Sequence, residues 1–187
     1  MRTEAGLQLL LLGGRSGSGK TTVAHEVSAQ LQALGVAHCH VEGDNLDAAY
    51  PKPADDPHGT HLTEVNLTAL WRNYQAIGHS RLIYVNTASI LEPKLFVRAM
   101  TAGDDRLVDV DVVAVELVAA DETAAARLAV REVGGGLALH VERSRRMAQL
   151  LAQQAPPGTV RVVTDDRGAA DVAAAVIDLT GWAGLDR

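Results

Sequence analysis

The stretch that decides the fold reads Gly14-Arg15-Ser16-Gly17-Ser18-Gly19-Lys20-Thr21. It has the pattern G-x-x-x-x-G-K-[ST], with an apolar run at residues 7–12 before it and a helical pattern after it. Glycine allows backbone conformations that residues with a Cβ avoid, so successive N–H groups can turn inward around a phosphate. The stretch therefore predicts a buried strand, a phosphate-binding loop and a helix, in that order.

The polar residues of this loop predict a bound nucleoside triphosphate with Mg²⁺. Lys20 can reach the β- and γ-phosphates, the Thr21 hydroxyl can supply an oxygen to Mg²⁺, and the helix start adds its positive dipole end. A glycine-rich turn without a ligand is the alternative, and we disfavour it because the flanking segments fit as well as the motif. The predicted nucleotide-binding residues of the loop are Gly14, Arg15, Ser16, Gly17, Ser18, Gly19, Lys20, Thr21 and Thr22.

Length, charge and cysteine content narrow the class of protein. The 187 residues suit one α/β domain spanning 1–187, and the net charge of −6 argues against nucleic acid or an acidic membrane surface as the main partner. Cys39 has no second cysteine with which to pair, which is compatible with a reducing compartment. The apolar run at residues 7–12 is too short to span a bilayer. We expect a cytoplasmic protein without a membrane partner, either a monomer or a homodimer.

Hydrophobic periodicity predicts alternating strands and helices along the chain. Such alternation gives a parallel sheet with helices on both faces and right-handed crossovers. Strands are predicted at residues 7–12, 36–41, 81–85, within 108–118, and at 159–163. Helices are predicted after Lys20, over 62–77, from Pro93, from Asp121, from near Glu142 after a break at Gly134–Gly136, and over a final segment.

Three of these helices carry a clear apolar stripe. We expect each stripe to face the core, because residues three and four apart lie on one side of a helix. The predicted core positions are Val23, Val27, Leu31 and Leu34 in the first helix, Leu67, Leu70, Trp71, Tyr74 and Ile77 in the second, and Val172, Ala175, Val176 and Leu179 in the last.

Three features together resemble a known group of enzymes: the loop at residues 14–21, a strand that ends in Glu42-Gly43-Asp44, and Arg127 with Arg131 before a glycine-rich break. The chain resembles the small P-loop kinases, such as adenylate, shikimate, gluconate and adenylylsulfate kinases. The resemblance implies a P-loop NTPase three-layer fold with a five-stranded parallel sheet, an acceptor-binding region at about 44–78 and a short mobile lid at about 127–146. It also implies ATP and Mg²⁺ as cofactors and transfer of the γ-phosphoryl group to a small-molecule acceptor.

Asp44 is the predicted catalytic acid of the acceptor side and a predicted metal-binding residue. It follows a strand's carboxyl end, where open parallel sheets bind their ligands. Family members with a similar D-x-D or D-G-D sequence use this position to orient or deprotonate the acceptor hydroxyl and to hold a metal-bound water. Asp44 could instead form a turn or cap beside Asn45. Glu42 lies two residues earlier and is expected to reach less far, so Glu42 and then His61 are the next candidates.

Arg127 and Arg131 lie four residues apart and therefore share one helix face. The resemblance implies that Arg127 lies over the adenine and that Arg131 reaches the phosphates, so both join Lys20 and Asp44 as predicted catalytic residues. Arginines after the glycine-rich break could clamp the transferring group or could form a solvated basic face: Arg143, Arg145 and Arg146. On the acceptor side, Arg72, Lys94 and Arg98 could contact an anionic acceptor or could be ordinary surface residues.

The chain departs from the kinase pattern in two places. Its third strand ends in Val85-Asn86-Thr87, where many relatives carry an aspartate that holds Mg²⁺ through water. The segment at residues 50–61 matches no acceptor motif of the named kinases, so the acceptor is unknown. Zinc binding by the neighbouring His38, Cys39 and His40 is disfavoured, because alternation along a strand sends Cys39 to the opposite face from both histidines.

Three other functions compete with the kinase reading. Asp121 and Glu122 follow an apolar run and could form the Walker B pair of a regulatory or mechanical ATPase. The sequence Asp165-Asp166-Arg167-Gly168 fits the D-x-x-G of a GTPase, although no N-K-x-D is present to read guanine. In the kinase reading this loop borders the adenine, which makes Asp166 a predicted nucleotide contact. A non-catalytic nucleotide-binding protein is the third alternative, motivated by Asn86.

Overall fold

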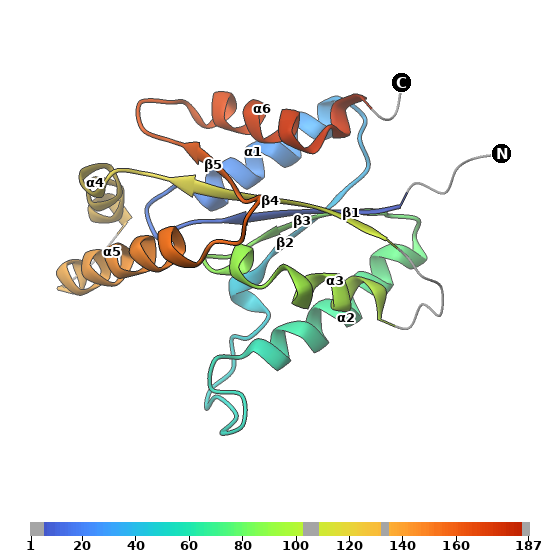
Figure 1. The fold of residues 1–187 in the computed structure, drawn as a ribbon, viewed down its shortest axis with the longest axis horizontal. Coiled ribbons are helices and arrows are strands. Elements are labelled where there is room, and N and C mark those ends of the chain that lie inside the picture. The colour runs from blue at the N-terminus through green and yellow to red at the C-terminus, as the bar shows by residue number, and fades with distance from the viewer. Residues whose placement is uncertain (1–5, 103–108, 132–134, 185–187) are drawn as a thin grey trace.

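A five-stranded parallel sheet forms the middle layer of the molecule (Figure 1). The structure is a computed structural model that describes residues 6–102, 109–131 and 135–184. The strands lie in the order β2-β3-β1-β4-β5. Their bounds are β1 (Leu7–Gly13), β2 (Cys39–Glu42), β3 (Arg81–Val85), β4 (Val110–Val118) and β5 (Val160–Val163). This confirms the predicted α/β fold with a five-stranded parallel sheet.

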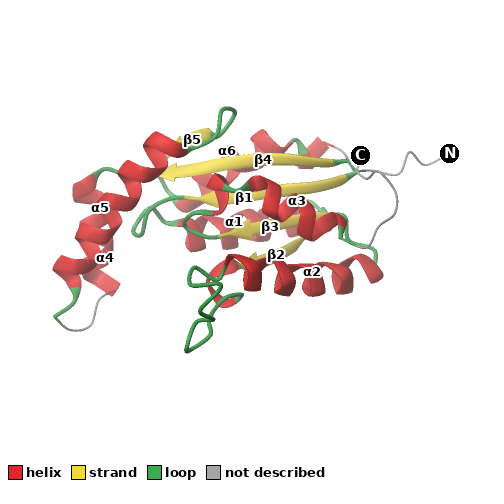
Figure 2. Ribbon diagram, turned by 60° about the horizontal axis from the view of Figure 1, so that its bottom comes forward, coloured by secondary structure: helices red, strands yellow, loops and turns green. Residues whose placement is uncertain are grey.

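Six α-helices surround this sheet within the described residues. They are α1 (Lys20–Ala33), α2 (Thr60–Ala76), α3 (Pro93–Thr101), α4 (Asp121–Arg131), α5 (Leu137–Gln154) and α6 (Ala169–Thr180). In Figure 1, α1 and α6 cover one face and α2 and α3 the other, while α4 and α5 extend past one end of the sheet. Figure 2 shows that this is the end toward which the strand arrows point. The connections that carry the predicted site therefore gather at that end.

The central strand β1 divides the core into two clusters. Leu10 and Leu12 pack with α1 and α6, whereas Leu9 and Leu11 pack with α2 and α3. All four side chains are fully buried, because β1 lies between β3 and β4 and has a helix layer on each side. The uninterrupted leucine run thus has the pattern of a strand buried on both faces.

The last residue of each predicted apolar stripe is exposed and does not lie in the core as predicted. Leu34, Ile77 and Leu179 are exposed, although the other stripe positions are buried or partly buried. Leu34 and Ile77 follow the last residues of α1 and α2, where the chain has already passed the rim of the sheet. In α6, Ile177 fills the core position that we assigned to Leu179.

Two elements begin at other residues than predicted. β2 begins at Cys39 rather than at Val36, because the Val36 amide donates to the Leu31 carbonyl of α1 instead of joining the sheet. α5 begins at Leu137 rather than near Glu142, since the helical hydrogen bonds already start at the Gly136 carbonyl. Val108 of the predicted fourth strand and Gly134 of the predicted break lie outside the described residues.

Within residues 6–102, 109–131 and 135–184, no helix is both long and apolar enough to cross a bilayer. Cys39, the single cysteine, is buried in β2 as a free thiol, and burial raises its pKa to about 11. The thiol is therefore protonated near neutral pH.

We predict that Leu11→Ala lowers the free energy of unfolding by about 2–5 kcal/mol, because the cavity it leaves lies in a rigid sheet core. Leu34→Ala is the matched control: it removes the same atoms from a side chain that is 50% exposed, against 0% for Leu11. Urea unfolding of both variants measures the difference. Equal losses for the two variants would contradict the assignment of β1 as the central core strand.

Candidate active site

The glycine-rich loop joins β1 to α1 at the carboxyl end of the sheet. Its first amide, on Gly14, donates to the Thr87 carbonyl after β3 at 3.2 Å. Gly14 has a φ of +141°, and a Cβ there would lie 2.5 Å from the Leu117 carbonyl oxygen of β4. A Cβ on Gly17 would lie 2.6 Å from the Ala124 carbonyl oxygen of α4. These two glycines let the loop pass between the strand ends and α4.

A cavity of about 160 Å³ opens beside this loop and collects most of the predicted catalytic residues. Lys20, Thr21, Asp44 and Arg131 all line it, so the structure brings these four predicted residues together. We name it the phosphate cavity. Its remaining lining residues are Ser16, Gly17, Gly19, Glu42, Val85, Asn86, Thr87, Leu128 and His140.

Lys20 lies at the first residue of α1, where its charge adds to the positive end of the helix dipole. Its Nζ donates to the Arg15 carbonyl at 3.2 Å. Burial lowers the pKa of Lys20, while the nearby charges of Asp44 and Glu42 act in the opposite direction. A buried ammonium at this position is short of counter-charge, and a phosphate group could supply it.

Asp44 and Asn86 connect the ends of β2 and β3. The Asn86 Nδ2 donates to Asp44 Oδ1 at 2.7 Å, and the Asn86 Oδ1 accepts from the Ala88 amide at 3.0 Å. Both ends of the side-chain amide are therefore used, and its donor faces the carboxylate. Asn86, which departs from the kinase pattern, orients Asp44 in this structure.

Glu42 reaches the phosphate cavity as well, contrary to the expectation that it would lie short of the sheet edge. Its carboxylate hydrogen-bonds the Thr21 side chain, and its buried Oε1 has no hydrogen-bond partner. Burial raises the pKa of Glu42, with a further increase from the charge of Asp44. Glu42 is the last residue of β2, and a long side chain at the end of a strand can extend past the sheet. This position in the strand could have predicted that Glu42 reaches the cavity.

The oxygen atoms of Thr21, Glu42 and Asp44 fit a magnesium ion. All three residues line one cavity, and carboxylate and hydroxyl oxygens are the ligands that this hard cation prefers. In the part of the chain that the structure describes, no group of three or more His, Cys, Asp or Glu side chains could hold a metal, so an ion in this cavity would have two carboxylates and the Thr21 hydroxyl as its protein ligands. His61, the last candidate for the base, lies exposed at the start of α2 and does not line the phosphate cavity.

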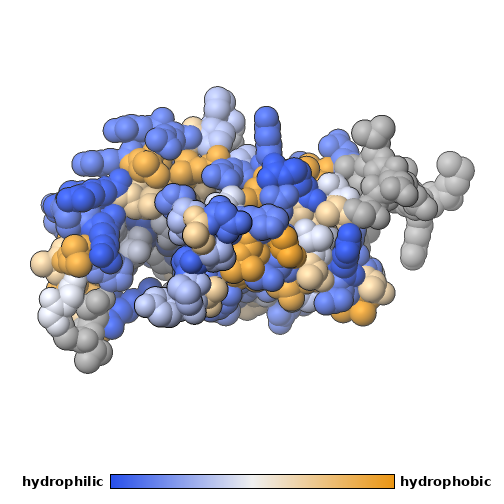
Figure 3. All heavy atoms as spheres, turned by 90° about the horizontal axis from the view of Figure 1, so that it is seen from below, coloured by the Kyte–Doolittle hydropathy of each residue, from blue (hydrophilic) through white to orange (hydrophobic). Residues whose placement is uncertain are grey.

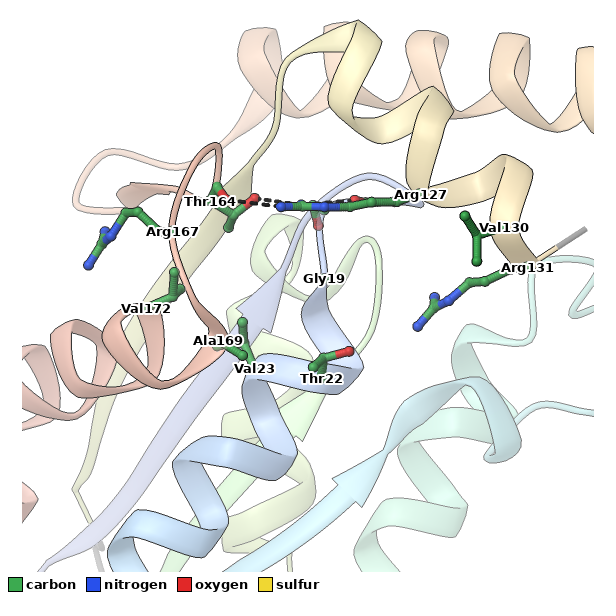
Figure 4. A pocket seen from close by; sticks show the side chains of 12 residues that line it. Gly19, Thr22, Val23, Arg127, Val130, Arg131, Thr164, Arg167, Ala169 and Val172 are labelled. Carbon is green, nitrogen blue, oxygen red and sulfur yellow. Dashed lines mark hydrogen bonds between the residues drawn. The ribbon is translucent and has the colours of Figure 1, made fainter.

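A second cavity, of about 330 Å³, lies on the other side of the loop between α4 and the start of α6 (Figure 4). We name it the nucleoside cavity. The Arg127 guanidinium crosses one wall, donating to Thr164 Oγ1 at 2.9 Å, to the Thr164 carbonyl at 3.0 Å and to the Gly17 carbonyl at 3.3 Å. The other lining residues are Ser18, Gly19, Thr22, Val23, Val130, Arg131, Arg167, Ala169 and Val172.

Arg127 is held flat by three carbonyl or hydroxyl oxygens, a geometry suited to stacking on a planar base. Arg131 lines both the nucleoside and the phosphate cavities, and so lies where a nucleotide's phosphates would pass from one to the other. Asp166 does not line the nucleoside cavity, whereas the next residue, Arg167, does. The loop after β5 therefore contributes Arg167 to the wall of this cavity, and a contact between Asp166 and the nucleotide stays a prediction.

The Arg15 side chain leaves the loop on the side of α4 and α5. It is 4% exposed, its Nε donates to Ser144 Oγ at 2.9 Å, and its Nη1 pairs with Asp121. The Ser144 hydroxyl in turn donates to the Ser16 carbonyl at 2.7 Å. Both helices of the predicted lid region are thus attached to the loop by a buried polar network. Nothing in the sequence pattern distinguished Ser144.

The arginines of α5 do not line the phosphate cavity. Arg145 pairs with Asp121 at 3.0 Å, and Arg146 pairs with Glu142 at 2.8 Å. Another α5 residue, His140, lines the cavity instead. It lies four residues beyond Gly136, and no motif or periodicity in the sequence pointed to it.

The same network bears on the Walker B alternative. The Asp121 carboxylate is engaged by two guanidinium groups, those of Arg15 and Arg145, and these hydrogen bonds lower its pKa. Neither Asp121 nor Glu122 lines the phosphate cavity that holds Lys20 and Thr21. This arrangement disfavours a role for the pair in activating water at the phosphates.

A third cavity, of about 260 Å³, adjoins the phosphate cavity on the side of α2 and α3. We name it the acceptor cavity. Asn86 lines both, so the two spaces meet beside Asp44. Four of its twelve lining residues come from the predicted acceptor region, one from β3, and seven from the segment after β3 and from α3. The lining residues are Asp47, His58, Thr60, Thr63, Tyr84, Asn86, Ala88, Ser89, Leu91, Glu92, Leu95 and Phe96.

The fold and the loop define this protein as a P-loop nucleotide-binding domain. A family model described as an AAA domain matches residues 9–157, and the chain belongs to that family. None of the curated proteins matches the chain. The resemblance to the small P-loop kinases is confirmed at the level of fold by the solved structures.

Several solved structures share the fold over nearly the whole chain. An adenylylsulfate (APS) kinase from Mycobacterium tuberculosis, in complex with AMPPNP and APS, is 24% identical, with a TM-score of 0.55 and coverage of 93% of this chain and 97% of that one. A shikimate kinase from Acinetobacter baumannii is 13% identical, with a TM-score of 0.56 and coverage of 98% and 97%. A tunicamycin resistance protein from Deinococcus radiodurans is 19% identical, with a TM-score of 0.61 and coverage of 94% and 96%.

We predict that Ser144→Ala weakens nucleotide binding as well as stability. It removes the hydroxyl between Arg15 and the Ser16 carbonyl, and an unsatisfied buried partner costs about 1–3 kcal/mol. Ser28→Ala is the matched control, because it removes another buried hydroxyl, bonded to His38 at 2.8 Å, away from the loop. Nucleotide titration of both variants by calorimetry tests this. Unchanged affinity in Ser144→Ala would show that α5 does not hold the loop.

Proposed function

We propose that this protein is an ATP-dependent phosphotransferase that moves the γ-phosphoryl group of ATP to a hydroxyl of a small molecule. The observation that carries the proposal is the junction at Asp44. Its carboxylate lines the phosphate cavity with Lys20 and is hydrogen-bonded to Asn86, which also lines the acceptor cavity. A donor phosphate and an acceptor hydroxyl in these two spaces would meet at this carboxylate.

The nucleotide is assigned to the two cavities on either side of the loop. The base lies against Arg127, and the phosphates pass Arg131 and the loop amides to reach Lys20. Lys20 and the amino end of α1 neutralise charge on the transferring group, which is the largest contribution that a protein makes to phosphoryl transfer. Thr21, Glu42 and Asp44 are the residues that would hold Mg²⁺, which supplies further neutralisation when bound.

Asp44 is assigned the role of general base toward the acceptor. The acceptor hydroxyl passes its proton to Asp44 while its oxygen bonds to the γ-phosphorus, the bond from that phosphorus to the β–γ bridging oxygen breaks, and ADP leaves. Asn86 positions the carboxylate by donating to Oδ1, so Oδ2 is left to accept the proton. Arg131 and His140 line the same space from α4 and α5 and are positioned to contact the transferring group.

The experiment that tests the activity is an ADP-release screen of the purified protein with Mg-ATP. The panel consists of hydroxyl-bearing metabolites, and Lys20→Ala serves as the blank. A phosphotransferase releases ADP only with particular small molecules. Release that is equal with and without every compound, and that depends on Lys20, would instead indicate an ATPase. Nucleotide binding without any release would indicate a non-catalytic nucleotide-binding protein.

We predict that Lys20→Ala folds normally but loses most triphosphate affinity or turnover, since the β- and γ-phosphates lose their buried counter-charge. Lys94→Ala is the control, because Lys94 is exposed on α3 and lines none of the three cavities. Thermal shift with Mg-ATP is the measurement. Equal stabilisation of the Lys20→Ala and parent proteins, together with equal activity, would remove Lys20 from the mechanism.

We predict that Asp44→Asn retains ATP binding but loses acceptor-dependent turnover by about two orders of magnitude or more, the usual effect of removing a general base. It should also require more Mg²⁺, because one of the two carboxylates of the phosphate cavity is gone. Glu42→Gln is the matched control: it should raise the Mg²⁺ requirement with a smaller loss of turnover at saturating metal. Parent-like turnover and Mg²⁺ dependence in Asp44→Asn would transfer the role of base to Glu42.

A further inference from the structure

The charges around the acceptor cavity differ from those that an anionic acceptor would need. Among its described lining residues there is no lysine or arginine, whereas two are acidic, Asp47 and Glu92. Asp44 adds a third carboxylate at the junction beside Asn86. An anion in such a space would lose its hydration without gaining an opposite charge, which is strongly unfavourable.

Three basic residues of the segments around the acceptor cavity have protein partners. Lys52 donates to the Asp47 carbonyl at 2.6 Å and to its Oδ2 at 2.5 Å. Arg98 forms a two-pronged ion pair with Glu64, at 2.9 and 2.7 Å. Arg72 donates to the Ala102 carbonyl at 3.3 Å. Of the three cations that the sequence offered for an anionic acceptor, Arg72 and Arg98 are thus engaged by protein groups and Lys94 is exposed on α3. None of the three lines the cavity.

Glu92 is the carboxylate of the cavity without a partner. It is exposed and lies immediately before α3, and no hydrogen bond or ion pair joins its carboxylate to another described residue. Asp47, in contrast, is neutralised by Lys52. Glu92 therefore adds a negative charge to the lining of the cavity, which also includes His58, and this charge acts on Arg98 as well. It would favour a protonated amine over a carboxylate, sulfate or phosphate.

The remaining walls suit a small molecule with both hydroxyls and an apolar face. Thr63, Ser89 and Tyr84 supply hydroxyl groups, and burial raises the pKa of Tyr84, which keeps its phenol protonated. Phe96 packs against Tyr84 with ring centroids 4.5 Å apart, and it forms an apolar surface with Leu95. The volume of about 260 Å³ is just below the range of sites for drug-sized ligands and suits a compound of monosaccharide size. Figure 3 shows the α2–α3 side of the molecule, where apolar residues form a patch among hydrophilic ones.

We propose that the acceptor is a small polyhydroxy compound without an anionic group, either uncharged or bearing a protonated amine, and that Glu92 excludes anionic analogues. This inference rests on the proposed phosphotransferase function, since it concerns the substrate of the same site. The acidic residues Asp47 and Glu92, together with the absence of lysine and arginine among the described lining residues, indicate an acceptor without an anionic group. The hydroxyl groups of the walls and the cavity volume of about 260 Å³ indicate a polyhydroxy compound of monosaccharide size.

The test uses sets of acceptors that are matched in size and differ in charge. The first set is glucose, glucosamine and gluconate, and the second is myo-inositol, an amino-inositol and an inositol monophosphate. ADP release by the purified protein is measured for each compound with Mg-ATP. We expect kcat/KM for an uncharged or amine-bearing member to exceed that of its anionic analogue by about tenfold or more, as repulsion and an unpaired anion require.

A charge reversal at Glu92 separates local recognition from net charge. Glu92→Lys should raise kcat/KM for the anionic member by about two- to fivefold, the range of an exposed charge pair, and lower it for the amine. Glu122→Lys makes the same change of charge on α4, away from the cavity, and should leave the preference unaltered. Equal shifts in the two variants would overturn the role assigned to Glu92.

The outcomes distinguish this inference from the proposed function. Lys20-dependent ADP release that is fastest with gluconate or the inositol phosphate would overturn the inference and leave the phosphotransferase intact. Equal use of the anionic and uncharged members would overturn it in the same way. If no compound of either set or of the wider metabolite screen stimulates ADP release, the proposed function fails and the inference fails with it.

Discussion

The burial of β1 on both faces is the constraint on which the rest of the structure depends. The strand pairs with β3 and β4, and its leucines alternate between two helix layers, so its carboxyl end can move little. The glycine-rich loop begins at that end and is held by the Gly14 amide on one side and by the close approach of Leu117 on the other. A loop that must present several amides to one phosphate needs such a fixed origin, because loop closure on a mobile strand would cost conformational entropy with every binding event.

The two helices beyond the sheet are connected to this origin by charged groups as well as by apolar packing, such as that of Leu151 of α5 in the core cluster of Leu9 and Leu11. Arg15 is buried between the loop and α5, where its Nε donates to Ser144 and its Nη1 pairs with Asp121, while its buried Nη2 has no hydrogen-bond partner among the described residues. A buried guanidinium is costly unless it is paired, so the position of α4 and α5 relative to the loop is narrowly defined. Arg127 of α4 also fixes this helix relative to the loop, because its guanidinium donates to the Gly17 carbonyl and to Thr164 Oγ1. Arg127 thus lines the nucleoside cavity and also bonds the loop, whereas Arg15 holds α4 and α5 from outside that cavity.

Much of the fold and part of the site could be predicted from the sequence. The loop motif identified Lys20 and Thr21, and the strand pattern placed Asp44 at the edge of the sheet, because these signals are local. The order of the strands and the contribution of Leu95 and Phe96 to the acceptor cavity could not be predicted, since they depend on which distant segments pack side by side. The network of Ser144 was equally hidden, because a serine inside a helix gives no periodic signal. The exposed Leu34 and Ile77 show that an apolar stripe does not reveal where its helix passes the rim of the sheet.

The hydrogen bond between Asn86 and Asp44 has a consequence for the protein before any ligand arrives. With an aspartate at residue 86, two carboxylates would face each other at hydrogen-bond distance, and one of them would have to bind a proton or a cation. The amide removes that repulsion and replaces it with a directed bond of 2.7 Å. The free protein can therefore hold Asp44 in a defined orientation without a metal ion. In this chain, folding alone therefore sets the geometry around Asp44, and binding of a cation is not needed to establish it.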